Sequence, residues 1–273
     1  MTRAIEIRNT LGDGAAASAS EGGPANDGAK PTGWATLRGA FKVVGDVPKP
    51  AALTVDKDVD VCAPGGKQVF GEELLVDTDG GIKNVVIYLT SKLPAEEPWS
   101  HPDAAPGKTD DVEFDQKECL FLSHVLALQT SQTLKIMNSD PVGHNAKMNP
   151  KENAPFNQII PGNAAIPYKF NVQEASPVSV ACSIHPWMNA AILVRDNSYF
   201  AITADNGSFE IPNLPAGIDL EFRVWQEKSK FLGDVTVNGQ ATRWKKGRFT
   251  INLDPANNNK NSLDVTIDAS VFQ

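Results

Sequence analysis

The chain lacks long apolar stretches and has fewer basic than acidic residues, and each of these features argues against a class of function. No stretch of the 273 residues approaches the roughly 18 consecutive apolar residues that a membrane-spanning helix needs. The 25 Lys and Arg residues are outnumbered by 33 Asp and Glu residues, which gives a net charge of −8. Nucleic acid and anionic membranes both require a basic surface, so neither is expected as the main partner. A basic protein partner fits the charge better.

The first 33 residues lack aromatic side chains and any apolar signal segment. Residues 1–10 are polar, so they do not form a secretory signal as they stand. Residues 11–33 are small and polar, and we predict that residues 1–33 form a disordered linker. A signal upstream of Met1 and a cytoplasmic protein both stay open at this point.

Helical periodicity is also scarce, and the best helix candidate, residues 66–75, is short. From Trp34 onward the chain consists of short segments rich in Val, Ile, Phe and Thr, bounded by Gly, Pro, Asn and Asp. This pattern predicts an all-β protein built as a β-sandwich or barrel. The segments divide into an N-terminal β segment with a Pro-rich acidic loop (34–117), a central part (118–196) and a C-terminal part (197–273).

The central part contains a group of potential metal ligands. Cys182, His185 and Met188 lie within seven residues between two apolar segments, and His144 follows another predicted strand. Thiolate and imidazole ligands suit copper in both oxidation states, and a thioether is a weak ligand that favours Cu(I). Two His and one Cys in a plane with a distant Met form a type 1 (blue) copper centre. We therefore predict one mononuclear copper, with adventitious zinc as a less suitable occupant.

The same residues resemble the cupredoxin family. The segment Cys182-Ser-Ile-His185-Pro-Trp-Met188 resembles the cupredoxin ligand loop in its amicyanin form, and Gly143-His144-Asn145 is similar to the first-histidine segment of plastocyanins and amicyanins. The resemblance implies a Greek-key β-sandwich, electron transfer, and a bracing role for Asn145 through hydrogen bonds near the ligands. Many cupredoxins carry Tyr where this chain has Val180, which affects packing beside the site.

The C-terminal part resembles a different family. Residues 201–227 are similar to carboxypeptidase regulatory-like, transthyretin-type β-domains, and residues 34–41 and 80–89 resemble opening strands of the same module. The resemblance implies an additional transthyretin-like β-module. Two organisations stay open: one composite sandwich, or a cupredoxin inserted into or followed by a second module.

The remaining cysteines and histidines restrict the chemistry further. Cys62 and Cys119 form either a disulfide, which would indicate an oxidising compartment, or two buried thiols. His101 and His124 are too few for a trinuclear copper cluster, so a multicopper oxidase is not expected. We interpret His124 as a structural histidine; the alternative is a second metal site with Cys62 or Cys119.

These observations predict a function and a weaker alternative. The protein is expected to carry one electron between protein redox partners, such as a cytochrome or dehydrogenase, in the periplasm or another extracytoplasmic space. Pro186 and Trp187 either form a docking patch around an exposed edge of His185 or, for Trp187, plug the core. The alternative is a binding or structural envelope protein in which copper is sensory or vestigial. Enzymatic use of Cys182 as a nucleophile is disfavoured, because no helix N-terminus activates the thiol.

Overall fold

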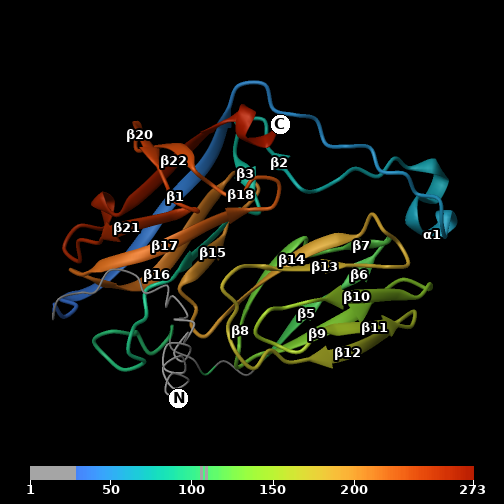
Figure 1. The fold of residues 1–273 in the computed structure, drawn as a ribbon, viewed down its shortest axis with the longest axis horizontal. Coiled ribbons are helices and arrows are strands. Elements are labelled where there is room, and N and C mark those ends of the chain that lie inside the picture. Colours follow the sequence, from blue (N-terminus) through green and yellow to red (C-terminus); the bar gives the residue numbers. More distant parts are fainter. Residues whose placement is uncertain (1–28, 105–106, 108–109) are drawn as a thin grey trace, which may run out of the picture.

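The computed structural model describes residues 29–104, 107 and 110–273, and nearly all its regular elements are β-strands (Figure 1). The predicted all-β fold is confirmed. Most of the linker predicted over residues 1–33 lies outside the described residues, and the first strand begins at Gly33. Residues 67–75 form no helix, and Phe70 lies in an isolated β-bridge with Ala52. No helix in the described part of the chain is long and apolar enough to cross a membrane.

One sandwich, here called the outer sandwich, combines the first and the last strands of the chain. Its strands are β1 (Gly33–Val44), β4 (Val86–Leu89), β15 (Phe200–Ile202), β16 (Ser208–Ala216), β17 (Asp219–Gln226), β18 (Lys230–Phe231), β19 (Asp234–Val237), β20 (Gln240–Arg243), β21 (Arg248–Asn252) and β22 (Ser262–Asp268). One sheet has the order β16-β1-β22-β19-β20, and the other has the order β15-β4-β17-β18 with β21 also on β17. A short ladder of β2 (Leu75–Val76) and β3 (Ile82–Lys83) and two 3-10 turns, Asn258–Lys260 and Ala269–Phe272, complete this part.

The second sandwich, here called the inserted sandwich, lies between β4 and β15 in the chain. Its strands are β5 (Asp111–Phe114), β8 (Val125–Gln129), β9 (Thr133–Asn138), β10 (His144–Met148), β11 (Phe156–Ile160), β12 (Ala164–Tyr168), β13 (Val178–Ala181) and β14 (Asn189–Arg195), with β6 (Gln116–Lys117) and β7 (Leu120–Phe121) as a small hairpin. The sheets have the orders β11-β10-β13-β14-β8 and β12-β9-β5. Strands β5 to β14 therefore interrupt the chain of the outer sandwich between β4 and β15. Strand β5 precedes the predicted boundary at residue 117, yet it pairs with β9 of the inserted sandwich.

Two strands are buried on both faces, and they hold the sandwiches together. In β4, Ile87 and Leu89 face the core of the outer sandwich, whereas Val86 and Tyr88 face the other way. Because side chains alternate along a strand, this fully apolar run serves two different cores. Strand β14 alternates in the same way. Its side chains in the core of the inserted sandwich are Ala190, Ile192 and Val194. Ala191 and Leu193 point the other way and join Val86 and Tyr88 in an apolar cluster at the junction of the two sandwiches.

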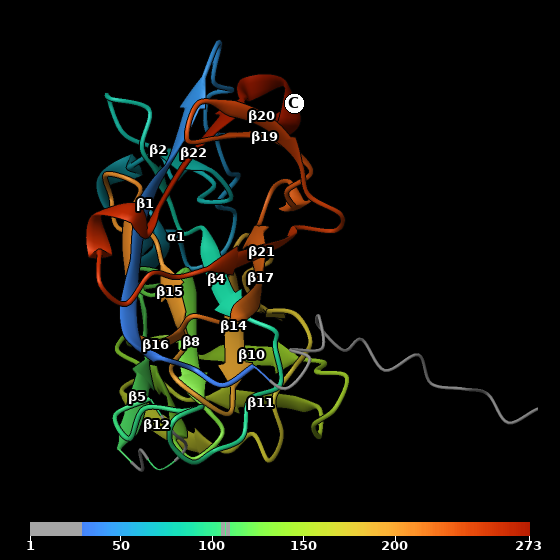
Figure 2. The ribbon, with the colours of Figure 1, turned by 90° about the vertical axis from the view of Figure 1, so that its left-hand side faces the viewer.

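Polar contacts surround this apolar junction. The buried guanidinium of Arg195 donates to the backbone oxygens of Glu174 at 3.1 Å and Leu89 at 2.9 Å, and lies over the Tyr88 ring. The Tyr88 hydroxyl donates to the backbone oxygen of Ala175 at 3.0 Å. The bonds of Arg195 to Leu89 and of Tyr88 to Ala175 connect the two sandwiches directly. The sandwiches therefore pack against each other (Figure 2).

A long excursion, here called the arm (residues 45–74), leaves β1 and returns to β2. It carries helix α1 (Val59–Cys62) and a 3-10 turn (Pro64–Gly66). Figure 1 shows the arm reaching from the outer sandwich to the far end of the inserted sandwich. Its two branches pair with each other, since Leu53 donates to Val69 and Gly71 donates to Ala51 through the backbone. The arm therefore brings residues of the N-terminal segment to the β6–β7 end of the inserted sandwich.

Candidate metal centre

Three of the predicted ligands lie on the tight loop between β13 and β14. The strands pair up to Ala181 and Asn189, directly beside the loop. Within the loop, the Cys182 amide donates to the Met188 carbonyl at 3.1 Å, and the Met188 amide donates to the His185 carbonyl at 3.0 Å. The loop is thus fixed by its own backbone and by the two strands that flank it.

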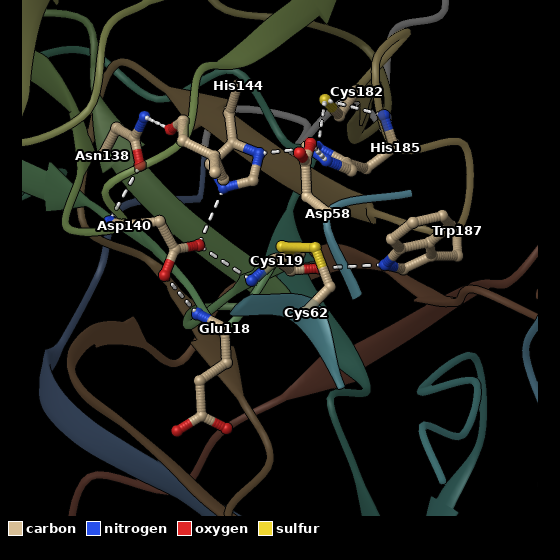
Figure 3. The surroundings of a disulfide bond; sticks show 11 residues. Asp58, Cys62, Glu118, Cys119, Asn138, Asp140, His144, Cys182, His185 and Trp187 are labelled. Atoms are coloured by element: carbon tan, nitrogen blue, oxygen red, sulfur yellow. Dashed lines mark hydrogen bonds and ion pairs between the residues drawn. A yellow bond between two sulfur atoms is a disulfide. The ribbon is translucent and has the colours of Figure 1, made fainter. Parts of the chain in front are cut away.

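His144 comes from a neighbouring strand and converges on this loop (Figure 3). It opens β10, which pairs with β13 on one side and β11 on the other. The Nδ1 atoms of His144 and His185 are 2.9 Å apart, and the Cys182 Sγ is 3.9 Å from the His185 Nδ1. Ligand atoms of all three residues lie within 4.8 Å of one another. The three side chains are buried, with 0 % of His144 and His185 and 2 % of Cys182 exposed.

The remote nitrogen of each imidazole is bound to a carboxylate. The Nε2 of His144 lies 2.7 Å from the Asp140 Oδ2, and the Nε2 of His185 lies 2.9 Å from the Asp58 Oδ2. A ring that donates through Nε2 presents its Nδ1 lone pair as an acceptor, and such carboxylate contacts fix the tautomer of metal-binding histidines. Asp140 is itself held by the backbone amides of Glu118 and Cys119. Both rings therefore direct a donor lone pair at the same point.

Burial and neighbouring groups shift the pKa values of all three side chains. Burial opposes the charged form of His144, but hydrogen bonds with Cys182 and Asp140 outweigh it and raise the pKa of His144. Burial also opposes the Cys182 thiolate, yet hydrogen bonds from His144 and backbone amides lower the pKa of Cys182. Burial lowers the pKa of His185, and Asp58 offsets only part of that effect.

The sulfur of Cys182 is surrounded by hydrogen-bond donors. The backbone amides of Asn145 and His185 both donate to it at 3.4 Å. The Asn145 side-chain oxygen accepts from the Ser183 amide at 2.7 Å, and its amide group donates to Asn157 at 2.8 Å. Asn145 thus connects the strand of His144 to the loop of Cys182.

Met188 is the fourth predicted ligand, and it lies fully buried at the end of the loop. It belongs to the same apolar core cluster as Cys182. A donor set of two imidazoles, one thiolate and a thioether on the same loop fits copper, because soft sulfur ligands combined with imidazole suit this metal. The residues present therefore match the group that the sequence predicts.

Cys62 and Cys119 form a disulfide, with 4.9 Å between their Cα atoms. It fastens helix α1 of the arm to the inserted sandwich next to the candidate site, and the cysteines are not free to bind a second metal. His124 instead contacts the carboxylates of Glu72 and Glu227, as expected for a structural histidine.

The His185 ring has no exposed edge, contrary to one of the two arrangements that the sequence left open for Trp187. The ring is fully buried because Asp58 and the arm cover its Nε2 side. Trp187 is half-buried, lies 5.2 Å from the His185 ring, and donates through Nε1 to the Cys119 carbonyl at 3.2 Å. Pro186 is exposed. Trp187 therefore packs between the loop and the disulfide, and partner docking at these two residues stays a prediction.

Sequence reasoning missed the two carboxylates. Asp140 stands four residues before His144, so a local pattern of Asp and His could have pointed to it. Asp58 stands 127 residues from His185 in the chain, and no local pattern connects the two. Only the disulfide partner Cys62, four residues further on, hinted that this segment approaches the inserted sandwich.

Comparisons with known proteins find similar solved structures over part of the chain. No protein-family model matches the sequence, and a search of curated proteins finds no match. A reduced Cu(I) form of an amicyanin variant is 20 % identical and covers 38 % of this chain and 97 % of its own, with a TM-score of 0.28. Amicyanin from Paracoccus versutus is 20 % identical over 40 % of this chain and 97 % of its own, with a TM-score of 0.27. A copper-containing nitrite reductase from Thermus scotoductus is 18 % identical over 38 % of this chain and 25 % of its own, with a TM-score of 0.28.

Proposed function

We propose that the protein binds one copper ion in a type 1 centre through His144, Cys182, His185 and Met188, and carries single electrons between protein redox partners. The observation that carries this proposal is the convergence of two carboxylate-fixed imidazoles and a thiolate on one buried point. Copper bound there would supply a one-electron Cu(II)/Cu(I) couple.

The surrounding residues supply the rigidity that electron transfer needs. The strands β10, β13 and β14 hold the ligands, and Asn145 connects two of these segments. The amides of Asn145 and His185 stabilise negative charge on the Cys182 sulfur in both oxidation states. Because these groups are buried and bonded to one another, they rearrange little when an electron arrives. Little rearrangement supports fast exchange.

The same burial supports a carrier rather than an enzyme. All four proposed ligands are at most 2 % exposed, so a substrate has no direct access to the metal. The acidic charge of the chain supports a basic redox protein as partner. The Cys62–Cys119 disulfide supports an oxidising location such as the periplasm.

Loading the purified protein with Cu(II) tests the proposal. The wild-type protein should bind one copper per chain and become intensely blue or green through charge transfer from the Cys182 sulfur. It should lose this colour with ascorbate and regain it with an oxidant. The Cys182→Ser variant should stay colourless while its far-UV circular dichroism matches the wild type.

A pale spectrum typical of an ordinary Cu(II) complex would refute the type 1 centre. A coloured protein that never cycles between oxidation states would refute the carrier function and favour a binding or structural role.

A further inference from the structure

The arm is fixed to the candidate centre at several points. The disulfide joins Cys62 to Cys119, and Lys67 forms an ion pair with Glu118 at 3.0 Å. Val55 and Val61, two partly buried side chains of the arm, pack against the core of the inserted sandwich. The arm is therefore a fixed part of the surface around the centre.

Asp58 is held in an unusual backbone conformation at the tip of the arm. Its φ of 48° and ψ of 40° lie in the left-handed region, which is costly for a residue with a side chain. Its carbonyl accepts from the amides of Val61 and Cys62, both at 2.9 Å, which ties it to the disulfide-linked helix. In the β6–β7 turn of the inserted sandwich, the backbone of Glu118 and Cys119 also lies in the left-handed region, with φ values of 50° and 54°. Strained residues thus meet where the arm touches the centre.

The Asp58 carboxylate connects solvent to a buried ring. Its side chain is 34 % exposed, whereas the His185 ring that it contacts is not exposed at all. Among the described residues, the other carboxylate bonded to a ligand ring is Asp140, which belongs to the inserted sandwich itself. Asp58 instead comes from the arm, which extends from the outer sandwich.

We propose that Asp58 is a positioning residue of the copper centre, through which the arm sets the electron affinity of the metal and closes the His185 edge to partners. This inference rests on the proposed copper function. The Nε2–H of His185 donates a hydrogen bond to the Asp58 carboxylate, so Nδ1 stays free to bind the metal. Its negative charge stabilises Cu(II) more than Cu(I), because the ion of higher charge gains more. The arm covers the His185 edge, so a redox partner could not contact this ring directly.

The reduction potential of copper-loaded variants tests the charge effect. Asp58→Asn keeps an acceptor oxygen but removes the charge, and Asp60→Asn removes an equal charge from an exposed position on the same helix. We expect Asp58→Asn to shift the ratio of Cu(I) to Cu(II) about tenfold toward Cu(I) at a fixed potential, which corresponds to about 59 mV for one electron. Asp60→Asn should shift that ratio less than about twofold, since its charge is exposed to solvent and screened.

Nitrogen NMR of the metal-free protein tests the contact without copper. The His185 Nε2 proton should exchange slowly with solvent in the wild type and in Asp58→Asn, and at least about tenfold faster in Asp58→Ala, because the acceptor and the cover are lost. Asp60→Ala should leave the exchange unchanged.

The outcomes separate the two proposals. A blue wild-type protein whose potential is the same in Asp58→Asn and Asp60→Asn overturns the role of Asp58 and leaves the copper function intact. Exchange of the His185 proton that is unaffected in Asp58→Ala also overturns it. A wild-type protein that becomes neither intensely blue nor green overturns the copper function, and the role of Asp58 is then overturned as well.

Discussion

Reducing the Cys62–Cys119 disulfide should lower the free energy of unfolding substantially. The two cysteines are 57 residues apart, and closing a loop of that length removes entropy from the unfolded chain equivalent to about 4 kcal/mol. The loop contains strands β2 to β4 of the outer sandwich and β5 and β6 of the inserted one. If the sandwiches unfold in separate steps, both transitions should therefore move to lower denaturant concentration.

Urea unfolding of the metal-free protein, with and without dithiothreitol, measures this effect. Circular dichroism follows the strands, and tryptophan fluorescence reports on the five Trp residues, among them Trp187, which donates to the Cys119 carbonyl. Reduced wild-type protein is the better comparison, because replacing both buried cysteines would also change the packing. A loss of about 1 kcal/mol or less would contradict the reasoning, since the chain-entropy account requires several times more.

Three further predictions concern single side chains. Met188→Leu keeps the side-chain volume but removes the thioether, so a chelator should remove copper from this variant at least about threefold faster than from the wild type. Met148→Leu, at an equally buried position, should lose copper at the wild-type rate. Both variants should change the free energy of unfolding by less than about 1.5 kcal/mol. Arg195→Met leaves two buried carbonyls unbonded at the junction and should cost about 2–4 kcal/mol in urea unfolding, and a cost equal to that of the exposed control Arg243→Met would contradict this. Burial raises the pKa of Tyr88 above its ordinary value near 10.0, so its contribution to stability is complete below pH 10.0 and is lost as the pH rises through the higher folded pKa. Tyr88→Phe should cost about 1 kcal/mol at neutral pH and make the alkaline loss of stability less steep, which unfolding curves between about pH 8 and 11 would measure.

The sequence predicted those parts of the site that are close together in the chain. Cys182, His185 and Met188 share one loop, so their residue types and spacing were sufficient to indicate copper. His144 was identified from its residue type and its position after a predicted strand. Asp58 could not be found this way, because its approach to His185 depends on the path of the whole arm.

The arrangement of the strands could not be fully predicted either, because it also depends on contacts between distant parts of the chain. The apolar runs of β4 and β14 predicted buried strands, but a period of two cannot tell which core each face meets. The burial of His185 could not be predicted for a related reason: the covering arm is distant in the chain, and no local pattern connects it to the ligand loop. The resemblance of residues 201–227 to transthyretin-type modules stays a prediction.

The pairing of β1 with β22 has a consequence for biosynthesis. Arg38 lies opposite Ser262 in this parallel pair, so the earliest strand must wait for the latest one before its sheet is complete. The inserted sandwich has its own apolar core, and all its strands leave the ribosome well before Ser262 does. Domains form as units during translation, so the ligand-bearing part can assemble first while β1 stays unpaired along this edge. We therefore expect the inserted sandwich to fold before the outer sandwich, and β1 to be among the last strands to complete its pairing.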